Sequence, residues 1–154
     1  MSEPGDREHI SERTSREYET MVRAVHAMEE ALASPAPGRE RAWKQRARRE
    51  LAAVVGYLQE HCESAESRDG LLTQVELTLG RSYEVTEART EHERLVRDAV
   101  SLLAALEEFP DEAALSYQEV RSRAFDFAAA LRRHQAREAD LLMLAFARDT
   151  GVGD

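Results

Sequence analysis

Residues 83–108 read YEVTEARTEHERLVRDAVSLLAALEE, and this stretch decides the fold class. Its apolar residues recur at alternating steps of three and four, which is the spacing of one face of an α-helix. The face also includes one histidine. The positions that share it are Val85, Ala88, His92, Leu95, Ala99, Leu102 and Leu106. The pattern therefore predicts a long amphipathic helix that directs His92 toward the protein interior.

The rest of the chain predicts more helices of the same kind. We expect long helices over residues 13–33, 39–67 and 112–149, and a short helix over 71–79, because turn-forming residues separate these segments. No segment alternates like a strand. The prediction is an all-α, antiparallel up-down-up-down four-helix bundle over residues 13–150, with a short extra helix between its second and third helices. Residues 1–12 are expected to be a disordered lead-in and residues 151–154 a tail.

Composition restricts the classes of partner. The 154 residues fit one domain, and the net charge of −9 argues against binding to nucleic acid or to anionic membranes. The longest uninterrupted apolar run covers residues 141–147, far short of the roughly 20 residues that a membrane helix needs. Cys62 is the single cysteine, so no disulfide can form within the chain. We therefore expect a cytoplasmic protein.

Three histidines and a glutamate indicate a metal site. His134 and Glu138 are four residues apart on the predicted fourth helix, so they share one face. That face also carries Phe127, Leu131, Leu141 and Ala145. His61 on the second helix lies 22 residues after Arg39, and His134 lies 23 after Asp111, so the two lie at similar depth, and His92 joins them from the third helix. Imidazole and carboxylate donors suit iron, zinc or manganese, and a bundle core can supply them from facing helices.

The first helix offers two candidates for a further ligand, Tyr18 and His26. Antiparallel helices bring residues together when they lie at similar distances from the connecting turn. Tyr18 lies 15 residues before Ala33, whereas His26 lies only 7 before it. In the second hairpin, His92 precedes the turn by a distance close to that of Tyr18. We therefore favour Tyr18.

A short internal match supports the same alignment. Residues 17–23, EYETMVR, resemble residues 91–97, EHERLVR, at most positions, and the match pairs Tyr18 with His92. The second helix has lost a counterpart of Glu138, because Ala65 stands four residues after His61. Glu66 is the nearest carboxylate, and it would reach the site if the helix loosened there. The resulting hypothesis is that the chain consists of two related helical hairpins, and that the first has lost some of the metal ligands that the second keeps.

These residues resemble the hemerythrin-like (HHE cation-binding) family of non-haem di-iron bundles. The resemblance covers roughly residues 14–150 and depends on EHE at 91–93, HQARE at 134–138, His61, and the ending RDTGVG at 148–153. It implies that histidines from the helices and bridging carboxylates hold one or two irons. By resemblance, the ligand positions are His61, His92, His134 and Glu138. The predicted ligand set adds Tyr18, selected by its depth, and Glu66 as the nearest carboxylate on the second helix.

The chain also departs from the family at two positions. Tyr18 replaces the first-helix histidine, and Ala65 replaces a carboxylate. A phenolate is a hard anionic donor that suits ferric iron. The leading prediction is an iron-binding protein for oxygen, nitric oxide or iron itself. The alternatives are a peroxide-consuming iron enzyme and a metal-free bundle that acts as an interaction or regulatory domain.

Overall fold

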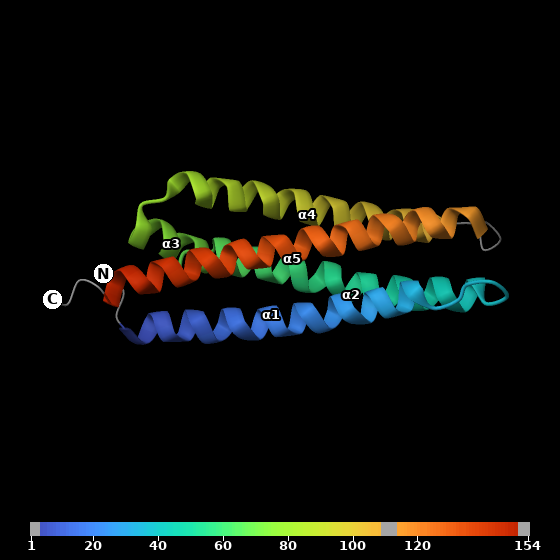
Figure 1. The fold of residues 1–154 in the computed structure, drawn as a ribbon, viewed down its shortest axis with the longest axis horizontal. Coiled ribbons are helices and arrows are strands. Elements are labelled where there is room, and N and C mark those ends of the chain that lie inside the picture. The colour runs from blue at the N-terminus through green and yellow to red at the C-terminus, as the bar shows by residue number, and fades with distance from the viewer. Residues whose placement is uncertain (1–3, 109–113, 151–154) are drawn as a thin grey trace.

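The structure is a computed structural model that describes residues 4–108 and 114–150, and these residues form five helices. Four of the helices are long and lie side by side, with chain neighbours running in opposite directions (Figure 1). The fold is the antiparallel four-helix bundle that the sequence predicts. The helix bounds are α1 Pro4–Ala33, α2 Glu40–Glu66, α3 Leu71–Leu79, α4 Ser82–Glu108 and α5 Ala114–Thr150.

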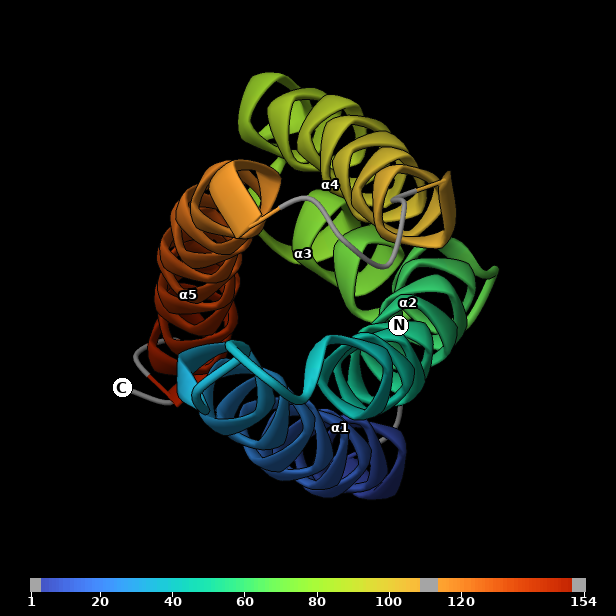
Figure 2. The same cartoon turned by 90° about the vertical axis from the view of Figure 1, so that its right-hand side faces the viewer.

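The long helices form a closed ring when the bundle is viewed along its axis. Helices α1 and α4 lie opposite each other, and each packs against both α2 and α5 (Figure 2). The short helix α3 packs against α2, α4 and α5 at the end of the bundle where α1 begins (Figure 1). Within residues 4–108 and 114–150, no helix has an apolar stretch long enough to cross a lipid bilayer.

The first helix begins earlier than the sequence predicts. Helix α1 starts at Pro4 instead of residue 13, so most of the stretch expected to be disordered is helical. Ile10 and Thr14 are buried there, and Ile10 lines a small cavity with residues of α3 and α5. Tertiary burial therefore stabilises this first part of α1. The expected helix start at residue 112 and the expected tail over 151–154 lie outside the described residues.

Two apolar clusters form the core, and a polar layer separates them. The larger cluster fills the bundle toward the α1–α2 turn and includes Leu58, Leu95 and Leu131. The smaller one surrounds α3 and includes Ala65 and Ala88. His61 therefore lies along α2 between Leu58 of one cluster and Ala65 of the other. The apolar packing on both sides fixes the helices at the level of the histidines.

The turn between α2 and α3 depends on close backbone packing at Gly70. A Cβ atom at this position would overlap the backbone carbonyl oxygens of Ser64 and Ala65. The turn draws the start of α3 against the end of α2, and the amide of Gly70 donates a hydrogen bond of 2.9 Å to the carbonyl of Ser67. The absence of a side chain at Gly70 thus permits the turn that packs α3 against the end of the bundle.

We expect Gly70→Ala to destabilise the protein. The added methyl group meets backbone atoms that cannot move independently, and overpacking of this kind costs about 1–3 kcal/mol of the free energy of unfolding. Chemical denaturation followed by circular dichroism measures the change.

Gly56→Ala is the matched control. Gly56 lies inside α2, where a Cβ atom would meet nothing within 4 Å. Alanine is favoured over glycine in a helix interior by about 1 kcal/mol, so this variant should be more stable than the unaltered protein. Equal stability of the two variants would contradict the steric role of Gly70.

Candidate metal centre

Four buried side chains from three helices meet in the polar layer. His61 comes from α2, His92 from α4, and His134 and Glu138 from α5; each is at most 5% exposed. Each residue offers one possible ligand atom, and these atoms all lie within 4.8 Å of one another. We call these four residues the donor cluster. The helical spacing predicted from the sequence is the reason for the convergence, because it directs all four side chains inward.

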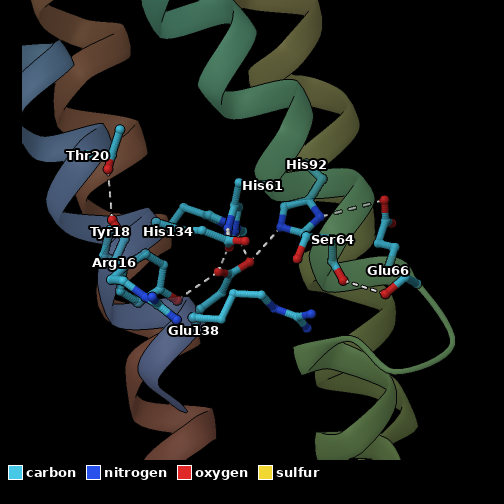
Figure 3. Close-up of polar contacts among 12 residues, drawn as sticks. Arg16, Tyr18, Thr20, His61, Ser64, Glu66, His92, His134 and Glu138 are labelled. Atoms are coloured by element: carbon cyan, nitrogen blue, oxygen red, sulfur yellow. Dashed lines mark hydrogen bonds and ion pairs between the residues drawn. The ribbon is translucent and has the colours of Figure 1, made fainter. Parts of the chain in front are cut away.

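The carboxylate of Glu138 lies at the centre of the donor cluster (Figure 3). Its Oε2 atom lies 2.8 Å from Nε2 of His61 and accepts a hydrogen bond of 2.8 Å from the Tyr18 hydroxyl. Its Oε1 atom lies 2.5 Å from Nε2 of His92 and 2.7 Å from Nε2 of His134. All three imidazoles therefore direct the same ring nitrogen, Nε2, at one carboxylate.

The outward nitrogen of each imidazole faces another glutamate. Nδ1 of His61 forms a hydrogen bond of 3.1 Å with Glu17. Nδ1 of His134 lies 3.0 Å from a carboxylate oxygen of Glu91. Outer carboxylates of this kind fix the orientation of a histidine and favour a proton on Nδ1, so that Nε2 is the nitrogen that would bind a metal.

The third histidine has a weaker outer contact. Nδ1 of His92 lies 3.8 Å from a carboxylate oxygen of Glu66, which is beyond hydrogen-bond distance (Figure 3). This nitrogen is buried and has no hydrogen-bond partner. The side chain of Glu66 is 34% exposed, so its carboxylate flanks the cluster from the solvent side.

The cluster holds a buried negative charge at its centre. Burial opposes the ionisation of Glu138, but close contacts with His134, His61 and His92 hold the pKa of this carboxyl well below its usual value. Burial also opposes protonation of His61, yet the contacts with Glu138 and Glu17 raise its pKa to about 9. Burial and the charge of Glu138 raise the pKa of the Tyr18 phenol above its usual value. At neutral pH the metal-free cluster thus combines an anionic Glu138, a protonated His61 and a neutral phenol.

The donor cluster could hold a metal ion. Metal–ligand bonds in such sites are about 2.1 Å long. The oxygens of Glu138 lie 2.5–2.8 Å from the three Nε2 atoms, so this carboxylate would move outward to admit an ion. Nε2 of His134 is close to Glu138 but is not aligned for a hydrogen bond, and neither ring nitrogen of His134 has a hydrogen-bond partner. A buried polar atom without a partner is costly, and a metal ion would satisfy it.

The structure places the other candidate ligands, which the sequence suggested in addition to the donor cluster, at different distances from its centre. The Tyr18 hydroxyl contacts Glu138, whereas His26 is exposed on α1. Helix α2 continues to Glu66 without loosening, and the carboxylate of Glu66 faces the outer nitrogen of His92 instead of the centre. Ala65, four residues after His61, is buried and supplies no counterpart of Glu138 on α2. The metal-ligand roles of Tyr18 and Glu66 stay predictions.

Two glutamates near the site were missed as functional candidates. Glu17 on α1 contacts His61 on α2, and Glu91 on α4 contacts His134 on α5. Each glutamate directly precedes a site residue, Tyr18 or His92, and reaches the histidine of the next long helix. The internal match between residues 17–23 and 91–97 contained this signal, because glutamate is identical at its first position.

Comparisons with protein-family models, curated proteins and solved structures found no match to this chain. The function is therefore inferred from the chemistry of the donor cluster.

We expect Tyr18→Phe to destabilise the metal-free protein. The variant removes a hydrogen bond to a buried carboxylate, and such bonds contribute about 1.5–3 kcal/mol. Denaturant unfolding in the presence of a chelator measures the loss. Tyr83→Phe is the control, because Tyr83 is 72% exposed and its hydrogen bond to Glu87 lies in solvent. An equal loss in both variants would contradict the role of the Tyr18 hydroxyl.

The stability of the metal-free protein should depend on pH in two windows. His61 has a raised pKa in the folded state, so its contribution is complete below pH 6.5 and is lost as the pH rises toward 9. The loss amounts to about 3 kcal/mol. Glu138 has a lowered pKa, so its contribution is present above pH 4.5 and is lost in more acidic solution. Denaturant unfolding from pH 2 to pH 10 with a chelator tests both, and a flat profile for His61→Asn above pH 6.5 assigns the alkaline window.

Proposed function

We propose that this protein is a hemerythrin-like, non-haem iron-binding protein that binds or senses oxygen, nitric oxide or iron. The observation that carries the proposal is the meeting of three buried imidazoles and one buried carboxylate at a single level of a four-helix bundle. Structural histidines inside a core need one partner each, whereas these three share the same carboxylate. Ligands from facing helices that converge in this way are typical of metal sites in bundles.

The mixture of donors favours iron. Nitrogen and carboxylate oxygen together suit first-row metals of intermediate softness, and the neighbouring phenol of Tyr18 adds a hard oxygen that suits the ferric ion. Iron in such a site supplies reversible binding of small diatomic molecules and exchange between two oxidation states. Among the described residues the donors form one group, which supports one ion per chain.

The protein's own residues prepare the site for a cation. Glu17 and Glu91 hold the outward nitrogens of His61 and His134, so the inner nitrogens stay directed at the centre. The proton on His61 and the proton on Tyr18 must leave when a metal takes their place. Metal uptake should therefore release protons and weaken in acidic solution.

A metal-free interaction domain is the second candidate, and one observation favours it. Glu138 is already surrounded by three imidazoles and a phenol, so its charge is compensated without any metal. Under this proposal the cluster would serve only to stabilise the bundle. The unpartnered nitrogens of His134 argue for the first candidate.

Elemental analysis and thermal melting distinguish the two candidates. We expect protein from iron-supplemented cells to contain about one iron per chain and to melt at a lower temperature after chelation, because a ligand of the native state alone stabilises it. His134→Ala should lose the iron, whereas His26→Ala should keep it. Iron content near zero, with a melting temperature unaffected by chelator, would contradict iron binding and favour the metal-free interaction domain.

The visible spectrum tests the first-helix ligand separately. A ferric–phenolate charge-transfer band in the iron-loaded protein should disappear in Tyr18→Phe and persist in Tyr83→Phe. Persistence of the band in Tyr18→Phe would place the tyrosine outside the metal's coordination.

A further inference from the structure

A cleft between α4 and α5 leads from the surface to the donor cluster. Its volume is about 560 Å³, and its lining includes two members of the cluster, His134 and Glu138. The opposite groove, between α2 and α4, has a volume of about 540 Å³ and reaches only His92 of the cluster. The α4–α5 cleft is therefore the more direct approach to the central carboxylate.

Most of the charged residues that line the cleft are acidic. Helix α4 contributes Glu84, Glu87 and Glu91, and α5 contributes Asp140, against the two arginines Arg94 and Arg137. Carboxylates that line a concave surface raise the local concentration of cations and speed their association. The charge of the cleft thus matches a small cation better than an anion.

A buried histidine that forms no hydrogen bond lies at the inner end of the cleft, although carboxylate oxygens lie 3.0 Å from its Nδ1 and 2.7 Å from its Nε2. His134 is 1% exposed, lines the cleft, and has no hydrogen-bond partner at either ring nitrogen. This histidine is an independent sign of a ligand, because exposed acidic residues alone are common on protein surfaces. A cation that passes the carboxylates would reach a nitrogen donor that is not committed to a hydrogen bond.

One ion pair connects the two walls of the cleft. The guanidinium of Arg137 on α5 pairs with Glu91 on α4, and Glu91 also lies 3.0 Å from Nδ1 of His134. The side chain of Arg137 is 59% exposed, so the pair can open into solvent without disturbing the core. While the pair is closed, its positive charge lies beside the route to His134.

We propose that divalent cations reach the donor cluster through the α4–α5 cleft, attracted by its carboxylates and slowed by the Arg137–Glu91 ion pair. This inference rests on the proposed metal-binding function and adds the route and its barrier. Arg137 would act as a gate that affects the rate of uptake more than the final affinity, because it is not part of the donor cluster.

Stopped-flow uptake of Co²⁺ by the metal-free full chain tests the route, with the visible absorption of the bound ion as the signal. Arg137→Gln should raise the association rate about threefold or more at low salt, and Glu87→Gln should lower it by a similar factor. Both effects should shrink toward unity at high salt, because salt screens charges near the surface. Equilibrium titration of each variant separates the rate of uptake from the affinity.

Arg97→Gln and Glu93→Gln are the matched controls. Both residues are exposed on α4 and line the opposite groove, and the substitutions change the net charge identically. Unchanged rates in these controls support the α4–α5 route. Equal effects in both grooves, or effects confined to the α2–α4 groove, would overturn it while leaving the metal site intact. A chain that takes up no Co²⁺ at equilibrium would overturn the proposed function and the route with it.

Discussion

The buried carboxylate of Glu138 is the constraint on which the interior depends. An ionised group in a protein core is tolerated only when other polar groups compensate for its lost hydration, and removal of one partner is strongly destabilising. Here the compensation comes from imidazoles on α2, α4 and α5 and from a phenol on α1. Every long helix is therefore tied to the same charge, and their relative depth in the bundle is fixed by it.

Most of the fold could be predicted from the sequence because amphipathic periodicity is a local signal. The short helix α3 has the predicted bounds, and the long helices α2 and α4 differ by single residues at their ends. The start of α1 could not be predicted in the same way. Burial of Ile10 depends on α3 and α5, which are distant in the sequence, and Ile10 is a single apolar residue among charged and polar neighbours along the chain.

The central residues of the site could also be predicted, because helical rise converts distance from a turn into depth. This reasoning selected Tyr18 over His26, and the structure brings Tyr18 to Glu138 while His26 stays exposed. The outer glutamates could not be found by depth alone. Glu91 is adjacent to His92 in the sequence but contacts His134 across the helix interface, and only the assembled pair of helices reveals that contact.

The polar layer between the two apolar clusters has a mechanical consequence. A helix bundle with one continuous apolar core tends to unfold as a single unit. A core divided by a polar layer can unfold locally on one side of that layer. The α3 end of this bundle has a small apolar cluster of its own and is joined to the rest through the histidine level. A ligand bound at that level would add a connection between the two clusters, because its donors lie on α2, α4 and α5, which contribute residues to both.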